Sequence, residues 1–391
     1  MRKNFTLFIV SDVISQFSAG MILIALNWYV IDTYRSNSLV ATVANINVVA
    51  GLVVSFVALK LFKQINAKQI ALLSYCFRIV CLILPLLLFQ LKSAEQFALY
   101  LVALSGGIGW NLYFPASKEI LNSFTTKETA LKTNALAEVS MQVGLFSATL
   151  FSGILYRYIG FENILLFGLI LFGIAFSLFA FIKYQGSVTV TSLVESNVFI
   201  YLARKKGLIL LGVVMYLPFI GVNVINTALP GYIREHLAGN SVDYGVTDTL
   251  YGLGACLASL LLPTIAKRFK SQKLVLFLFL LATILGTGLV FNQQLSFAAI
   301  YIFILGSVDP TIRTLIYTKV TELVPDNLLG SLMTFCNFVN LIFQFGANYS
   351  TGKLMDAVGA KWGFSVYAGL MLVGCVIFLS IQKTYRKSKK A

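Results

Sequence analysis

Histidine and acidic residues are scarce in this 391-residue sequence. It has one histidine, His236, and 15 Asp and Glu against 30 Lys and Arg. Its cysteines all fall in apolar stretches, without the spacing typical of metal ligands, and they are Cys76, Cys81, Cys256, Cys336 and Cys375. We therefore expect no metal, no cofactor and no disulfide. An enzyme is not expected either, because the pattern offers no metal cluster and no nucleophile–base pair.

Motifs for nucleotide and nucleic-acid binding are also missing. No Gly-Lys-Ser/Thr loop of the kind that cradles phosphates occurs, so we expect no direct use of ATP. The net charge of +15 alone would favour a nucleic-acid partner, but its distribution gives another explanation. If both termini are cytoplasmic, 22 of the 30 Lys and Arg lie on the cytoplasmic side, as the positive-inside rule requires. The charge therefore indicates membrane topology and contact with anionic lipid, with no nucleic acid.

Apolar sequence is what the chain has in abundance. It is 58% hydrophobic, with a mean hydropathy of +0.84. Twelve mostly apolar stretches are each long enough to cross ~30 Å of hydrocarbon as a helix. The first carries Asp12 and has no small-residue cleavage site, so we interpret it as a helix and not as a signal peptide. The expected helices span residues 5–31, 38–59, 70–91, 96–117, 133–155, 162–182, 207–233, 249–266, 274–293, 296–318, 328–352 and 362–382.

The longest gap between apolar stretches divides the chain into two halves. We expect an N-terminal six-helix bundle at residues 1–183 and a cytoplasmic linker at 184–206. A C-terminal six-helix bundle with a short basic tail is expected at residues 207–391.

Short motifs recur at matching places in the two halves. A pair of glycines seven residues apart follows the fifth and the eleventh stretch, and a cation follows a helical proline by three residues. The correspondences are Gly153 with Gly352, Gly160 with Gly359, Pro115 with Pro310 and Lys118 with Arg313. Together they indicate a parallel repeat about an axis along the membrane normal.

Polar residues gather on single faces of several apolar helices. Such stripes either line a water-filled path or hydrogen-bond neighbouring helices, and both interpretations are open. Aromatic residues on the same helices either contact a flat, amphipathic ligand or pack. The candidates for a substrate cavity are Gln16, Asn27, Arg78, Trp110, Tyr113, Tyr216, Asn223, Asn226, Arg313, Asn337, Asn340 and Gln344.

Five charged residues lie inside the expected helices. A charge at mid-bilayer costs several kcal/mol unless it is paired or hydrated, so each is a functional candidate. Asp309, near mid-membrane, is the first candidate for carrying a proton, followed by Glu138 and Asp12. Arg313 lies one turn from Asp309, so a static ion pair is an equally good interpretation. Arg78 either faces an anionic substrate or neutralises Asp12 or Glu138.

Several stretches resemble the major facilitator superfamily, and within it the bacterial drug- and macrolide-efflux proteins and the enterobactin exporter. They are Ser15-Gln-Phe-Ser-Ala-Gly20, Ala25-Leu-Asn-Trp-Tyr-Val30, Tyr75-Cys-Phe-Arg78, Tyr113-Phe-Pro-Ala-Ser117 and Thr133-Asn-Ala-Leu136. The resemblance covers essentially the whole chain. It implies an all-α integral membrane fold of twelve transmembrane helices in two pseudo-symmetric six-helix bundles, with both termini cytoplasmic. Two family motifs are incomplete: the loop at 60–69 lacks the usual acid, and Phe146-Ser-Ala-Thr149 replaces a Gly-Pro pair.

The resemblance implies secondary active transport. The expected function is proton-coupled export of a small amphipathic or anionic compound, a siderophore, metallophore or drug, across the bacterial plasma membrane by alternating access. Uptake or lipid flipping by the same fold is an alternative, and a non-transporting receptor or sensor is another. The expected partners are the small-molecule substrate, protons and the lipid bilayer. We expect a monomer, because this fold encloses its own path.

Overall fold

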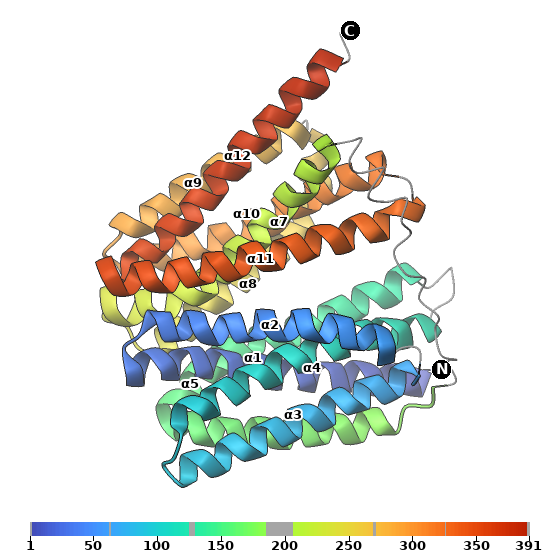
Figure 1. Cartoon of the computed structure of the whole chain (residues 1–391), viewed down its shortest axis with the longest axis vertical. Coiled ribbons are helices and arrows are strands. Elements are labelled where there is room, and N and C mark those ends of the chain that lie inside the picture. Colours follow the sequence, from blue (N-terminus) through green and yellow to red (C-terminus); the bar gives the residue numbers. More distant parts are fainter. Residues whose placement is uncertain are drawn as a thin grey trace. The chain divides into compact units, whose positions relative to one another are not determined.

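The computed structural model describes residues 2–61, 64–124, 130–184, 206–268, 271–324 and 326–388. Within these ranges the regular secondary structure is entirely helical (Figure 1). The helices are α1 (Arg2–Tyr34), α2 (Asn37–Leu61), α3 (Ala67–Gln90), α4 (Glu95–Ser123), α5 (Ala130–Ala180), α7 (Lys206–Gly231), η1 (Tyr232–His236), α8 (Ser241–Arg268), α9 (Ser271–Phe291), α10 (Leu295–Leu323), α11 (Asp326–Val358), η2 (Ala360–Trp362) and α12 (Gly363–Ser388).

Ten helical segments in the described residues are long and apolar enough to cross a membrane. The long helix α5 counts once among them, although it is two helices that meet at Gly160, where φ is 75° and ψ is 176°. Helix α11 is not among the ten segments found in the described residues. The structure is therefore that of an all-α, multi-pass membrane protein, while twelve separate crossings stay a prediction.

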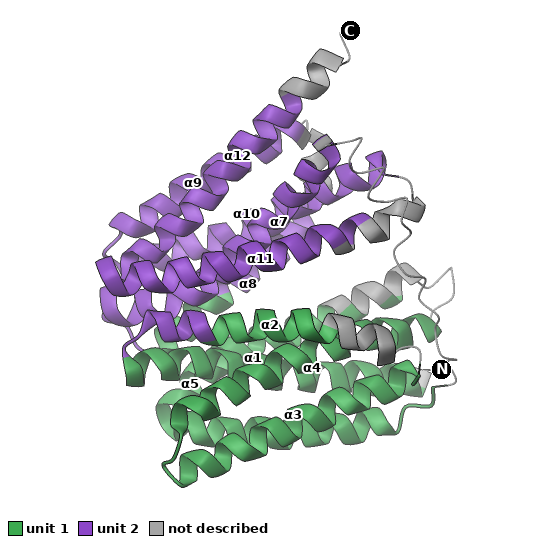
Figure 2. Cartoon of the chain, viewed as in Figure 1, with its two compact units in different colours: residues 1–34, 43–191, 241–249 green, residues 35–42, 192–240, 250–391 purple. Residues whose placement is uncertain are grey.

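The chain folds into two compact units, shown in green and purple in Figure 2. The first unit comprises residues 1–34, 43–191 and 241–249, and the second comprises residues 35–42, 192–240 and 250–391. The start of α2 thus groups with the second unit and the start of α8 with the first. The expected linker at 184–206 lies, except for its two end residues, outside the described residues.

The recurring glycines have matching structural roles. Gly160 and Gly359 are the two glycines with positive φ in the described chain, at 75° and 120°. A side chain at Gly153 would collide with the Ser241 carbonyl of α8, and one at Gly352 would lie 2.7 Å from the Asn37 carbonyl of α2. In each half, one glycine therefore permits close helix contact and the next permits a left-handed turn. These roles agree with the repeat interpretation.

The N-terminus of α2 is held by the end of α11. The Asn37 amide donates to Asp356 Oδ1 at 2.8 Å, and the Ser38 amide donates to Asp356 Oδ2 at 2.9 Å. The Leu39 amide donates to Ser36 Oγ at 3.2 Å, so three of the four unpaired N–H groups of this helix end have acceptors. Partial burial acts to raise the pKa of the Asp356 carboxyl, but these hydrogen bonds outweigh it and lower the pKa overall.

Candidate functional site

The first unit contains a buried carboxylate, Asp12 on α1, that is 5% exposed. Its Oδ1 accepts hydrogen bonds from the Tyr113 hydroxyl of α4 at 2.9 Å and from Gln16 Nε2 at 3.3 Å. Its Oδ2 accepts from Ser140 Oγ of α5 at 3.1 Å. The structure thus brings together three residues that the sequence identified on separate grounds, and it adds Ser140.

Close helix packing positions the donors around Asp12. Gly144 of α5 lies against α1, where an added Cβ would be 2.7 Å from the Val13 carbonyl oxygen. The Tyr113 ring packs edge-on against Tyr75 of α3, with ring centroids 5.4 Å apart. The Tyr75 hydroxyl lies 3.3 Å from Ser11 Oγ on α1. Tyrosines from two neighbouring helices therefore fix the direction of the hydrogen bond to Asp12.

The second unit contains Asp309 of α10, which is 1% exposed. The Tyr367 hydroxyl of α12 donates to its Oδ1 at 2.7 Å, and the Tyr251 hydroxyl of α8 donates to its Oδ2 at 3.2 Å. In the described residues Asp309 forms no ion pair with Arg313, so the static pair that the spacing allows is not formed. The Arg313 guanidinium is exposed and lies 5.4 Å from the centroid of the Phe219 ring.

Glycines bring the two tyrosines to Asp309. Gly306 of α10 lies directly against the Tyr251 carbonyl, so α8 and α10 approach closely one turn before Asp309. The Tyr367 ring fits between Gly221 of α7 and Gly286 of α9, where added Cβ atoms would lie 2.8 Å and 2.7 Å from it. Any side chain at these glycines would displace a donor of Asp309.

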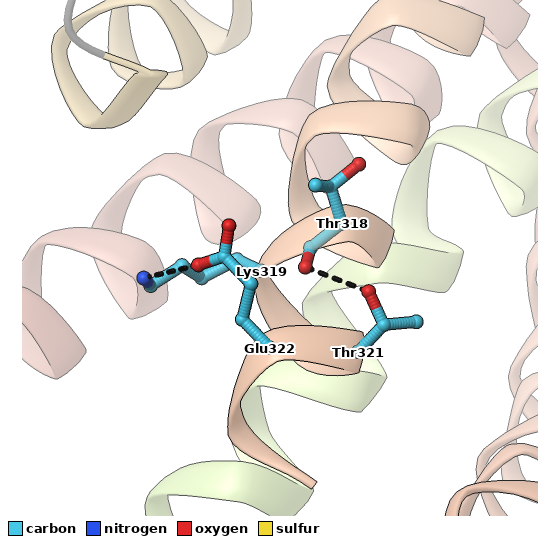
Figure 3. Close-up of polar contacts among 4 residues, drawn as sticks. All are labelled: Thr318, Lys319, Thr321 and Glu322. Carbon is cyan, nitrogen blue, oxygen red and sulfur yellow. Dashed lines mark hydrogen bonds and ion pairs between the residues drawn. The ribbon is translucent and has the colours of Figure 1, made fainter. Parts of the chain in front are cut away.

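Both carboxylates receive their hydrogen bonds from neutral side chains. Within the described ranges one ion pair is present, between Lys319 and Glu322 on α10 (Figure 3). Both side chains are exposed, and Lys319 Nζ lies 2.7 Å from Glu322 Oε2. Neither Asp12 nor Asp309 has such a cation in direct contact. Protonation therefore removes an unbalanced negative charge from each site, as expected for a carboxylate that carries a proton.

Arg78 of α3 is buried, with 2% of its surface exposed. It lines a cavity of about 40 Å³ in the first unit, together with Asn47 and Ser105. No ion pair joins it to Asp12 among the described residues, so neutralisation by direct pairing is not observed. The side chain of Glu138, the other expected partner, lies outside what the structure describes.

Of the aromatic candidates of the first unit, Tyr113 belongs to the Asp12 cluster, whereas Trp110 has its contact elsewhere. Trp110 is 37% exposed and stacks on Phe114, with centroids 5.1 Å apart. Asn27 hydrogen-bonds Tyr244 at the start of α8, and this tyrosine stacks on Trp28 at 5.7 Å.

The candidates of the second unit lie on α7 and α11. On α7, the Tyr216 hydroxyl donates to the Met333 carbonyl at 3.4 Å, and Asn223 Nδ2 donates to the Phe219 carbonyl at 2.9 Å. Asn226 on the same helix is half-buried.

On α11, Asn337 is exposed, whereas Asn340 and Gln344 are buried. The amide of Asn340 has no hydrogen-bond partner within the described ranges.

Sequence reasoning missed several residues of these clusters. Helix α8 begins at Ser241 and not near residue 249, so Asp248 is a further carboxylate inside a membrane helix. Acidic residues are common in the first turns of helices, so Asp243, in the first turn of α8, was a usable signal for an earlier start. Tyr251 and Tyr367 gave no signal, because a single tyrosine in an apolar helix fits packing equally well.

The sequence matches the family model of the Major Facilitator Superfamily over residues 8–219 and 209–391. The chain belongs to the Major Facilitator Superfamily. Compared by sequence with curated proteins, it gives no match.

Solved transporter structures share the fold of this superfamily member. The nucleoside transporter NupG is 13% identical, with a TM-score of 0.79, covering 97% of this chain and 99% of that one. A bacterial homologue of the iron transporter ferroportin is 13% identical, with a TM-score of 0.74, covering 97% and 99%. A bacterial homologue of the human lysosomal transporter Spinster is 11% identical, with a TM-score of 0.71, covering 97% and 94%. Such low identities show the fold alone.

Proposed function

We propose that this protein is a secondary active exporter of the bacterial plasma membrane. Inward proton flow drives the export of a small amphipathic or anionic compound, a siderophore, metallophore or drug. The mechanism is alternating access, in which the six-helix bundles at 1–183 and 207–391 move against each other. Both termini and most of the Lys and Arg lie on the cytoplasmic side, in agreement with the positive-inside rule.

The observation that carries the proposal is the environment of Asp309. This carboxylate is 1% exposed, and its hydrogen bonds come from the hydroxyls of Tyr367 and Tyr251. Intramembrane carboxylates without a fixed counter-charge are typical of proton relays in transporters. Asp12 has the same character in the first unit, with neutral donors and 5% exposure. Proton coupling through Asp309, with Asp12 as a second site, follows from these two environments.

The substrate class rests on exposed side chains of three helices. Arg313 of α10 is exposed and lies over the Phe219 ring of α7, so an anionic group and an aromatic group are both within its reach. Trp110 and Phe114 form an exposed aromatic stack on α4. Within the second unit, Arg313 and Phe219 suit a compound with one apolar part and one anionic part.

The test is transport into inside-out membrane vesicles that contain the protein. Uptake of a panel of siderophores and lipophilic drugs is measured with and without a protonophore. We expect protonophore-sensitive uptake of one compound class, reduced in Asp309→Asn to the level of vesicles without the protein. Glu322→Gln is the matched control, because it removes a carboxylate charge from the exposed end of the same helix and is expected to transport normally.

Two results would contradict the proposal. Normal export by Asp309→Asn, with Asp12→Asn also normal, would exclude both carboxylates from proton coupling. The absence of uptake of every compound by the wild type would instead favour uptake into the cell or lipid flipping by the same fold.

A further inference from the structure

The first unit contains a partly open cavity of about 40 Å³ that is lined by residues of α1 to α5. Its polar lining residues are Asn47, Arg78 and Ser105, and the remainder are apolar or glycine. Among the described residues, Arg78 is the one charged residue of the lining, and no acidic residue takes part in it. The cavity is therefore electropositive and mostly apolar.

Among the described residues, the positive charge of Arg78 has no counter-charge in direct contact. The residue is 2% exposed, and its Nε has no hydrogen-bond partner in the described part of the chain. The nearest acidic candidate, Asp12, takes its hydrogen bonds from Tyr113, Ser140 and Gln16. The guanidinium carbon lies 5.0 Å from the Phe172 ring centroid, a contact that attracts a cation without neutralising it.

The backbone of α4 fixes Arg78 in this position. A Cβ at Gly109 would overlap Nε of Arg78, so the arginine stem crosses α4 at the one point where a glycine leaves room. Ser74 Oγ donates to the Gly109 carbonyl at 2.8 Å, which ties α3 to α4 one turn before Arg78. The guanidinium is therefore held at the cavity by packing from both helices.

A buried charge without a partner is unfavourable, and a counter-ion in the cavity would offset this cost. An ion buried without a partner costs several kcal/mol, which a counter-ion in contact offsets. Asn47 adds a donor, because its Nδ2 uses one N–H on the Val43 carbonyl and has a second for an anion.

The size of the cavity limits what it can hold. A water molecule needs roughly 10–15 Å³ of such space, so the cavity of about 40 Å³ accommodates a few water-sized groups. Drug-sized ligands need roughly 300–1,000 Å³. The cavity is therefore too small for the body of a transported compound, and it suits a compact ion. One arginine balances one negative charge.

We propose that the cavity beside Arg78 is a binding site for one small monovalent anion, a halide or a carboxylate no larger than formate. The anion neutralises Arg78 inside the first unit and is not the exported compound. The site is independent of the proposed function, because it binds without transport and without a proton gradient.

The test uses the purified full-length protein in detergent. Its melting temperature is measured at constant ionic strength while gluconate, which is too large for the cavity, is replaced by chloride or by formate. Binding to the folded state raises the melting temperature as the anion concentration exceeds the dissociation constant. We expect a saturable rise with at least one of the two anions, and saturable binding of radioactive chloride or formate at about one ion per chain.

Substitutions assign the effect to Arg78. Arg78→Met removes the charge with similar volume and is expected to abolish the anion dependence, whereas Arg78→Lys retains the charge and is expected to keep part of it. Arg157→Met removes the same charge from an exposed arginine of the same unit and is expected to behave as the wild type. If Arg78→Met does not fold, the wild-type ion stoichiometry and the Arg78→Lys variant still decide the outcome.

The opposite results would overturn the proposal. A wild-type melting temperature that responds to neither chloride nor formate, without saturable binding, means that water alone fills the cavity. An anion response that persists unchanged in Arg78→Met means that the ion binds elsewhere on the surface. Transport measurements do not enter either outcome, so failure of export and failure of this site are distinguishable.

Discussion

The two units hold their buried charges in different ways. In the first unit, Asp12 has three hydrogen-bond donors, whereas Asp309 in the second unit has two. Arg78 in the first unit is 2% exposed, whereas Arg313 in the second unit is exposed. The exposed arginine is accessible to a ligand, whereas the buried one needs a counter-charge inside the protein. The two arginines thus have different roles, because one is exposed and the other is buried.

The internal repeat explains only some of the positions of the cationic side chains. Lys118 and Arg313 follow matching prolines, and each lies over a phenylalanine ring, at 5.3 Å and 5.4 Å from the centroid. Arg78 has no such counterpart, because α9, the matching helix of the second half, carries one cation, Lys273 in its first turn. A cation over a phenylalanine ring therefore occurs in both halves, within α4 in the first and between α10 and α7 in the second, whereas the buried Arg78 has no counterpart in α9.

The largest expected difference between the two carboxylate sites concerns their tyrosine donors. Tyr367→Phe should destabilise the protein by about 3 kcal/mol, because Asp309 is left with one donor and hydrogen bonds to charged groups contribute roughly 1.5–3 kcal/mol. Tyr113→Phe should cost about 1.5 kcal/mol, because Asp12 retains Ser140 and Gln16. Thermal unfolding of the purified variants gives both values.

The exposed Tyr349 of α11 is the control for loss of a tyrosine hydroxyl. Tyr349→Phe should leave the unfolding temperature unchanged. A larger loss in Tyr113→Phe than in Tyr367→Phe would show that the number of donors does not determine the stability of these sites.

The next effect concerns the packing of Arg78. Gly109→Ala places a methyl group where Nε of Arg78 lies, so we expect a loss of about 2 kcal/mol, within the range typical of overpacking. Gly173→Ala is the matched control in the same unit, because nothing lies within 4 Å of its added Cβ. It should be neutral or slightly stabilising, since alanine favours a helix. Equal unfolding temperatures for the two variants would mean that Arg78 moves aside freely.

The smallest expected effect concerns the contact between α11 and the start of α2. The pKa of Asp356 is lowered overall in the folded protein, since the hydrogen bonds from Ser38 and Asn37 outweigh the effect of burial. A lowered pKa means that the stabilisation is present above the ordinary aspartate range and is lost as the pH falls through the lowered value. Asp356→Asn should remove about 1 kcal/mol, as for loss of a helix cap, and should abolish this pH dependence.

Hydrogen exchange of the Asn37 and Ser38 amides reports this contact directly. Exchange at these amides should accelerate roughly fivefold in Asp356→Asn at neutral pH, which corresponds to about 1 kcal/mol. Glu322→Gln, in an exposed ion pair worth little, is the control and should not change it. Unchanged protection in Asp356→Asn would show that Ser36 caps α2 sufficiently by itself.

The sequence located one carboxylate cluster more completely than the other. Asp12 and Gln16 are one helical turn apart on α1, so their proximity follows from helical geometry alone. Tyr367 and Asp309 are 58 positions apart on different helices, and no local pattern connects them. The ion pair of Asp309 with Arg313 was allowed by spacing, but two tyrosine hydroxyls occupy the carboxylate instead.

The sequence by itself determined the membrane class, the superfamily and the repeat of the two halves. These properties follow from sums over many residues, namely apolar length and charge distribution, and from glycine spacing that both halves share. The tertiary structure decided which charged side chains form an ion pair, which are exposed and which are buried. That choice depends on a few ångströms between helices distant in sequence, as where Gly109 admits Arg78 and where Gly221 and Gly286 admit Tyr367. Hydropathy does not report such contacts, because it assigns each residue type one value, wherever the fold places that residue.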